Sequence, residues 1–304
     1  MDRKCYPLDN MDIITKNKTQ YNQWCDKKIA NFTSNLDDLF VEITDPTKLS
    51  KPERDKIIKI ISQNNLCFFE LQKPVDVEKN HIRLLADSVG MSNYESCNTS
   101  DEYFISEISN KTEHDIVGEY IPYTNKALNW HTDGYYNPIT TPILSWMLYC
   151  MNPAEEGGIN KFLDHELLYI YFNKESERIE ELMDKSAYCI PKNEAIGRAD
   201  EYGYIFNFIK DKLHMRFTMR MKNIIWKDEV KDLVGILKKT IEKLRRYQIE
   251  CKLQKGQGVF TNNVLHMRTS FKETYNDQRL LLRMRAGHRI CLLYTSPSPR
   301  DLYQ

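Results

Sequence analysis

The apolar positions along the chain follow patterns that separate helices from strands. In KPERDKIIKIISQNN (51–65) four isoleucines recur near helical spacing, and between 226 and 248 the apolar residues advance in alternating steps of three and four. Both patterns predict amphipathic helices. VEKNHIRLLADSVGM (77–91) predicts another helix, which ends at Gly90. LCFFEL (66–71) is a short apolar run typical of a buried strand.

The residue composition of the chain after Asn129 is typical of a β core. NWHTDGYYNPITTPILSWMLYCMNP mixes aromatic and β-branched residues with turn residues, as short strands do. A helix over 164–185 separates this region from later strands. Those strands are expected at 202–209, 213–221, 256–271 and 279–287. One face of 213–221 carries His214, Arg216, Thr218 and Arg220. We expect that face to be solvated, with contact to an anionic substrate as the alternative.

Composition and charge argue against several classes of protein. The 304 residues contain 43 Lys and Arg and 43 Asp and Glu, so the formal net charge is zero, which does not fit a strongly basic nucleic-acid-binding protein. No stretch approaches the ~18 consecutive apolar residues of a membrane span, and the first 30 residues show no secretory signal. Eight scattered cysteines without a CxxC pair favour a reducing compartment, so we expect a cytoplasmic protein.

One small group of residues has the pattern of a metal site. His131 and Asp133 are two apart in a predicted strand, so their side chains share a face. His266 lies in another predicted strand, and two histidines with one carboxylate form the facial triad of non-haem Fe(II) oxygenases. An HxD pair alone is a weak signal, because a buried structural histidine beside an aspartate is more common.

The surroundings of these residues resemble the TauD/TfdA (taurine dioxygenase-like) family of Fe(II)/2-oxoglutarate-dependent dioxygenases. NWHTDGYYNP, EEGGINKFLD, GQGVFTNNVLHMRTSF and QRLLLRMRAG follow the order of the family: HxD, a GG turn, a distal histidine, then arginines. The resemblance covers roughly 50–287. It implies a mainly β fold with flanking helices and a double-stranded β-helix (jelly roll, clavaminate synthase-like) core.

The resemblance also implies roles for single residues. The His/Asp/His set matches the metal ligands of the family, and Arg279 matches the arginine that holds the distal carboxylate of 2-oxoglutarate. Arg283 matches a second arginine near the co-substrate or an anionic substrate group; for it and Arg285 the alternative is a solvated strand face. Many members have a threonine shortly after the GG turn, whereas this chain has Asn160, which can also donate a hydrogen bond.

For some neighbouring residues the sequence allows more than one role. Arg268 is a candidate for contact with a metal ligand, for contact with the substrate, or for an ordinary salt bridge. Tyr135 and Tyr136 either line the pocket or pack, and packing is the expectation. Asn262 and Asn263 stand where the family often has Asp-Asn. We expect a structural turn there, or a contact with one of the metal ligands. We expect structural or surface roles for the remaining isolated histidines, which are His81, His114, His165 and His288.

The activity implied by the resemblance couples oxidative decarboxylation of 2-oxoglutarate, to succinate and CO2, with C–H hydroxylation of a small polar or zwitterionic metabolite. Its partners are the small-molecule substrate, O2, Fe(II) and 2-oxoglutarate, without nucleic acid or membrane; family members are often dimers or tetramers. Two alternatives remain: a zinc-dependent enzyme on the same site, and a non-catalytic jelly-roll binding protein. The sequence leaves open the substrate, the position oxidised, and whether the outcome is hydroxylation, desaturation or demethylation.

The expected organisation is a single jelly-roll dioxygenase domain over 51–287, preceded by a partly ordered N-terminal arm over 1–50. The tail 288–304, HRICLLYTSPSPRDLYQ, departs from the texture of the domain. Its segment YTSPSPRD resembles translated cloning sequence, so the tail is a candidate for non-native sequence.

Overall fold

The largest element of the protein is a six-stranded sheet. The computed structural model describes residues 18–74, 77–96, 99–110, 121–194, 197–220, 224–274 and 278–291. In this sheet β1 pairs with β2 in parallel and every other pairing is antiparallel. The strand order is β1 (Phe40–Ile43), β2 (Leu66–Leu71), β14 (Gln257–Thr261), β5 (Ser145–Asn152), β17 (Leu280–Ala286) and β3 (Ser106–Ile108).

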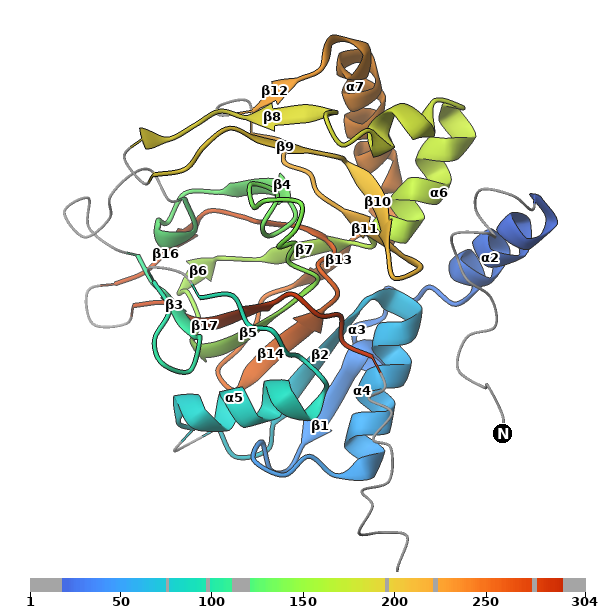
Figure 1. Ribbon diagram of the computed structural model, residues 1–304. Helices are drawn as coiled ribbons and strands as arrows, with labels where there is room; N and C mark the ends of the chain where they lie inside the picture. The colour runs from blue at the N-terminus through green and yellow to red at the C-terminus, as the bar shows by residue number, and fades with distance from the viewer. Residues whose placement is uncertain are drawn as a thin grey trace, which may run out of the picture.

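A four-stranded antiparallel sheet faces the first and closes the core (Figure 1). Phe162 of the second sheet packs edge-on against Phe68 at 5.6 Å and tilted against Trp146 at 6.3 Å, so the aromatic layer between the sheets is shared. This arrangement confirms the predicted double-stranded β-helix core. The strand order is β13 (Ile249–Cys251), β7 (Asn160–Leu163), β15 (Leu265–Arg268) and β4 (Leu128–His131).

Two of the predicted helices flank the main sheet, as the ribbon shows at its base (Figure 1). α4 (Lys51–Asn64) begins with a capping box between Ser50 and Glu53 and ends at Asn65, whose φ is 56°. Its isoleucines are buried, and the helix packs against β1 and β2. α5 (Lys79–Ser88) ends just before Gly90, whose φ of 89° stops the helix. Both predictions are confirmed.

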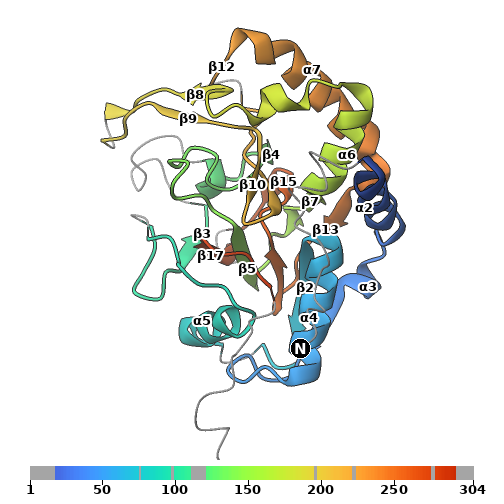
Figure 2. The ribbon, with the colours of Figure 1, turned by 45° about the vertical axis from the view of Figure 1, so that its right-hand side comes forward.

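A second layer of helices covers the other end of the molecule, where α6 (His165–Glu175) and α7 (Asp228–Lys243) lie together (Figure 2). The predicted helix over 164–185 ends at Glu175, and η3 (Ile179–Met183) follows it. The predicted strand 202–209 is split into two. The remaining short elements are η2 (Ile121–Tyr123), β6 (Glu156–Gly157), β8 (Tyr188–Ile190), β9 (Glu201–Gly203), β10 (Phe206–Ile209), β11 (Lys212–Met215), β12 (Ile225–Trp226), η5 (Leu244–Tyr247) and β16 (Phe271–Lys272).

The expectation of a solvated polar face over 213–221 is wrong. The strand ends at Met215, and His214, Arg216 and Thr218 are 2%, 1% and 1% exposed, while Arg220 is half-buried. The reason is that the chain leaves the strand and runs beside 130–132, so both sets of side chains become enclosed; the Thr132 N–H donates to the Phe217 carbonyl at 2.9 Å.

The two ends of the chain depart from the expected organisation. Residues 18–50 form α2 (Lys18–Ala30), α3 (Leu36–Leu39) and β1, and β1 is a strand of the main sheet, because Val41 and Ile43 bury the apolar face of an otherwise polar segment. Residues 288–290 pack onto the domain: Ile290 is buried, and its backbone N–H donates to Asn262 Oδ1 at 2.8 Å. YTSPSPRD lies outside the described residues. Among the helices that are described, none has the length and apolar character needed to cross a membrane.

Candidate metal centre

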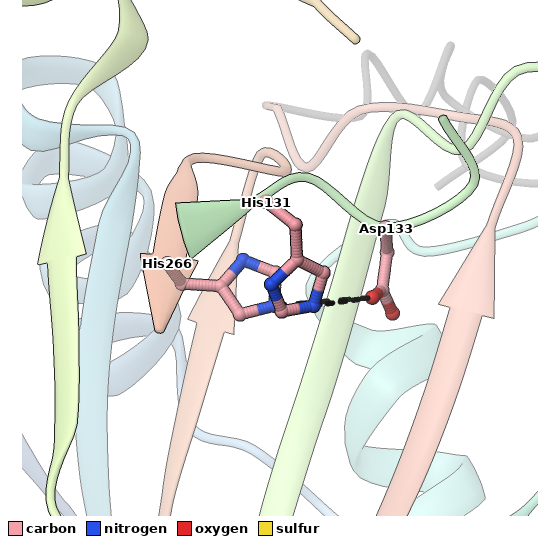
Figure 3. A group of neighbouring side chains, drawn as sticks. All are labelled: His131, Asp133 and His266. Carbon is pink, nitrogen blue, oxygen red and sulfur yellow. Dashed lines mark ion pairs between the residues drawn. The ribbon is translucent and has the colours of Figure 1, made fainter. Parts of the chain in front are cut away.

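The three predicted ligands come together at one end of the second sheet (Figure 3). His131 closes β4 and pairs directly with His266 on β15, so the two rings project side by side from adjacent strands. Asp133 follows in the turn after β4. Nε2 of each histidine lies 3.8 Å from Asp133 Oδ1, and one ligand atom from each residue falls within 4.8 Å of the others. The set fits a divalent ion bound from one side.

Backbone contacts fix which nitrogen of each ring can bind a metal. Nδ1 of His131 lies 2.8 Å from the Asn129 carbonyl, and Nδ1 of His266 lies 3.0 Å from the Val264 carbonyl. A carbonyl only accepts, so each Nδ1 carries the proton and each Nε2 presents a lone pair. Burial lowers the pKa of His131 to about 3 and also lowers the pKa of His266. Both rings are therefore neutral, as metal ligation requires.

Asn263 holds the third ligand through its backbone. Its Oδ1 accepts from the Asp133 N–H at 2.9 Å and from Trp146 Nε1 at 3.2 Å, and its Nδ2 donates to the carbonyls of Asp133 at 2.9 Å and Ile143 at 2.7 Å. All four hydrogen bonds of this fully buried amide are used, and its φ of 55° belongs to the left-handed region that asparagine tolerates. The expected turn at this position therefore also positions Asp133, the candidate carboxylate ligand.

Two arginines of the last strand set the charge of the aspartate. Arg283 Nη1 lies 3.5 Å from Asp133 Oδ2. Burial alone would raise the pKa of Asp133, but the charges of Arg283 and Arg285 outweigh it and hold this pKa well below its usual range. The carboxylate is thus ionised and ready to bind a cation. Arg285 is 7% exposed and Arg283 is half-buried, so the alternative of a solvated strand face is wrong.

Arg216, which was expected on a solvated face, instead stabilises the turn that follows Asp133. Its Nη2 donates to the Tyr135 carbonyl at 2.9 Å and to the Asn137 carbonyl, while the Tyr188 hydroxyl also donates to the Tyr135 carbonyl at 2.7 Å. The turn begins at Gly134, whose φ is 68°. No local sequence signal marks Arg216 for this role, because its partners are backbone carbonyls 79 and 81 residues away.

The same turn is held from the side of the main sheet. Arg285 Nη1 donates to the Tyr136 hydroxyl at 2.8 Å and forms an ion pair with Glu95, which in turn accepts from Asn137 Nδ2 at 2.7 Å. The rings of Tyr135 and Tyr136 pack edge to face at 5.1 Å, and neither lines the described cavity, in keeping with the expected packing role.

A cavity opens beside the triad between the two sheets. Its lining is apolar where Trp146 and Leu148 face it. Its polar lining consists of the three triad residues together with Asn160, Arg268, Arg279 and Arg283. The structure thus brings the predicted metal ligands, Arg279, Arg283 and Asn160 to one cavity, together with Arg268, for which the sequence allowed several roles.

Arg279 and Asn160 present free donors to this cavity. Arg279 directly precedes β17 and is 3% exposed, and Asn160 begins β7 and is 7% exposed. Arg279 Nη1 and Asn160 Nδ2 are buried without a hydrogen-bond acceptor in the described part of the chain. Buried donors are normally satisfied, so these two indicate a bound acceptor that the protein itself does not supply.

The GG turn brings its strand close to β16. Gly157 and Gly158 have φ values of 70° and 68°, and a Cβ on Gly157 would lie 2.2 Å from the Ser270 carbonyl oxygen. No side chain fits there, which explains why the turn needs glycine. The turn leads directly into Asn160.

His165, His81 and His288 have structural or surface roles, as expected, and His214, which was expected on a solvated face, is also structural. His165 Nε2 contacts the Leu213 carbonyl at 2.9 Å and His214 Nε2 contacts the Ile143 carbonyl at 3.0 Å. His81 accepts from the Glu78 N–H at the start of α5, and His288 bonds Ser92. The remaining one, at position 114, lies outside the described residues.

Three solved structures share this architecture. The chain is similar to the asparagine oxygenase AsnO (9% identity, TM-score 0.56, covering 82% of this chain and 93% of that one). It is similar to the non-heme iron oxygenase OrfP in complex with Fe and alpha-ketoglutaric acid (14%, TM-score 0.59, 79% and 81%). It is also similar to a taurine dioxygenase from Burkholderia xenovorans (13%, TM-score 0.55, 82% and 87%). At these identities the likeness establishes the fold.

Sequence comparison assigns the family. No curated protein matches the chain. The model of the family described as taurine catabolism dioxygenase TauD, TfdA family, matches residues 34–285, most of the chain. The chain therefore belongs to the TauD/TfdA family, the Fe(II)- and 2-oxoglutarate-dependent dioxygenases that its fold and its His/Asp/His site had indicated.

Proposed function

We propose that His131, Asp133 and His266 hold the Fe(II) of this dioxygenase, and that Arg279 and Asn160 bind the distal carboxylate of 2-oxoglutarate. One observation carries the assignment: two neutral imidazoles and one ionised carboxylate converge beside a cavity with unpartnered buried donors. When bound, the iron supplies the chemistry that activates dioxygen at the expense of 2-oxoglutarate.

The protein's own residues orient the reactants and exclude water. The guanidinium of Arg279 matches a carboxylate in shape and charge, and Asn160 adds a neutral donor. Trp146, which is 1% exposed and packs on His266 with 4.6 Å between ring centroids, shields that side of the site. These contacts favour one orientation of the co-substrate in a dry cavity.

The substrate proposed for this site is a small polar or zwitterionic metabolite, in the manner of an amino acid. One solved complex of OrfP contains (3S)-hydroxy-L-Arg, and an asparagine oxygenase has been solved with 3-hydroxyasparagine. Arg283 supports a substrate carboxylate here, because its buried Nε has no described partner. The described lining contains three arginines and one carboxylate, Asp133, which favours an anionic group over a cationic one at this position.

The test needs no substrate. Fe(II) and then 2-oxoglutarate are added to apoprotein without oxygen, and the visible charge-transfer band of the chelate is recorded. We expect a band in the wild type, none in His131→Ala, and a band in Arg279→Ala that requires about 10- to 100-fold more 2-oxoglutarate. A folded wild type without the band would refute the proposal and favour zinc chemistry or a binding role. Succinate release then screens amino acids as substrates.

The proposal extends to the protein's organisation and surroundings. A single domain from about residue 36 to 290 is supported by β1 at one end and Ile290 at the other. A cytoplasmic location is supported by the six described cysteines, none of which is paired. Limited proteolysis tests the bounds, cell fractionation tests the location, and light scattering tests whether the protein forms a homo-oligomer.

A further inference from the structure

The cavity contains one more buried arginine, Arg268, whose charge is not neutralised. Arg268 lies on β15 two residues after His266 and is 4% exposed. Its Nη atoms donate to the carbonyls of Pro122 at 3.3 Å, Thr124 at 2.8 Å and Lys126 at 2.5 Å. Carbonyls satisfy these donors but carry no net charge. No carboxylate of a described residue contributes to the electrostatics of Arg268, so it remains an uncompensated cation.

A second cation lies close by. Arg279 is 3% exposed and lines the same cavity as Arg268. Both guanidinium groups carry a positive charge, as arginine does even in a partly buried site. Each guanidinium carbon lies within 5 Å of the Phe271 ring centroid, at 4.8 Å for Arg268 and 4.9 Å for Arg279. Glu273, whose Oε2 accepts from the Arg279 backbone N–H at 2.9 Å, attracts Arg279 but does not act on Arg268. Two buried like charges repel unless a further anion lies with them.

The free donors of this region belong to three different elements. Arg268 Nε, Arg279 Nη1 and Asn160 Nδ2 are each buried without an acceptor among the described residues. Arg268 and Asn160 are direct partners in the β15–β7 pairing, and all three residues line the same cavity. One ligand that is anionic and accepts several hydrogen bonds would satisfy all of them. A carboxylate, with two oxygens and about four lone-pair sites, meets this requirement.

We infer that Arg268 joins Arg279 and Asn160 in binding the distal carboxylate of 2-oxoglutarate, and that this second arginine makes the protein select 2-oxo acids with a distal anion. The inference rests on the proposed function, because it assumes that 2-oxoglutarate occupies this cavity. The carbonyls of 122–126 hold the guanidinium in advance, so little side-chain freedom is lost when the ligand binds.

The test compares two 2-oxo acids that differ only at the distal end. 2-Oxoglutarate and 2-oxopentanoate have the same five-carbon chain, but the second ends in a methyl group. Dissociation constants are measured for both by anaerobic calorimetry on the Fe(II) protein, for the wild type, Arg268→Met and Arg268→Lys. Arg245→Met, which removes an exposed arginine, is the matched control.

In Arg268→Met we expect 2-oxoglutarate to bind about 10- to 100-fold more weakly, while 2-oxopentanoate changes less than about twofold. Arg268→Lys keeps the charge and should lose less than the methionine variant; it also serves if Arg268→Met does not fold. An equal loss for both acids in the variants would mean that Arg268 only holds 122–126, and would overturn the inference alone. A wild type that binds neither acid would instead overturn the proposed function.

Discussion

The proposed metal end and the proposed carboxylate end of the cavity differ in how their polar groups are satisfied. At the metal end the polar groups behind the ligands have protein partners: both Nδ1 atoms meet carbonyls, and Asn263 uses all four of its hydrogen bonds. At the other end, donors of Asn160, Arg268 and Arg279 have no described acceptor. The first arrangement is complete before any ligand binds, whereas the second is complete only with an anion. Changes at the metal end should therefore affect folding as well as binding, and changes at the carboxylate end mainly binding.

The largest effect is expected from Asp133→Ala. Removing the carboxylate leaves two imidazoles and the buried charge of Arg283, so Fe(II) affinity should fall at least about 100-fold. Calorimetric titration with Fe(II) under argon measures the loss. Asp211→Ala, on the turn between β10 and β11, is the control. Wild-type affinity in Asp133→Ala would remove this residue from the site.

Asn263→Asp should have the next largest effect. A carboxylate cannot donate to the carbonyls of Asp133 and Ile143, so two buried acceptors lose their donor. We expect about 3 kcal/mol less free energy of unfolding and about 10-fold weaker Fe(II) binding. Urea unfolding and metal titration measure the two quantities, with Asn31→Asp on the surface as the control. A loss of stability without any loss of metal affinity would separate Asn263 from the site.

Arg216→Lys tests the turn that follows Asp133, and its expected effect is smaller than that of Asn263→Asp. An ammonium group cannot reproduce the paired contacts to Tyr135 and Asn137, so we expect a loss of about 2 kcal/mol in the free energy of unfolding. Affinity for Fe(II) should fall by less than in Asn263→Asp, because Arg216 acts on the turn and not on Asp133 itself. Unchanged unfolding in urea would contradict the structural account of this arginine.

The smallest effect concerns pH. Burial lowers the pKa of His214 to about 3, below its usual value near 6.5, so the unfolded chain binds a proton that the folded protein does not. Stability from this residue is complete above pH 6.5 and is lost as the pH falls toward 3, by up to about 1.4 kcal/mol per pH unit. Unfolding measured between pH 7 and 5 should show a shallower slope in His214→Gln. The same slope in both proteins would contradict this assignment.

Local patterns were sufficient for much of the fold and for the metal ligands. Helical spacing located α4 and α7, because a helical period is a property of a short segment. The His/Asp/His set was identified through the resemblance to the family, since the HxD pair alone is a weak signal and His266 lies in a distant strand. The role of Arg216 was missed because it depends on backbone carbonyls brought near by the fold. β1 was missed because it is only four residues long, too short for its three apolar side chains to show a clear period. The position of Arg268 opposite Asn160 likewise depends on strand pairing that no single segment encodes.

The contacts between residues 288–290 and the segments around the proposed metal site have a consequence for biosynthesis. Ile290 bonds Asn262, the neighbour of the residue that holds Asp133, and Ser145 donates to the His288 carbonyl at 2.5 Å. His131 leaves the ribosome long before His266 and residues 288–290 do, and a nascent chain folds from its N-terminal side onward. The proposed iron site is therefore expected to bind metal only after the chain has been synthesised beyond His266.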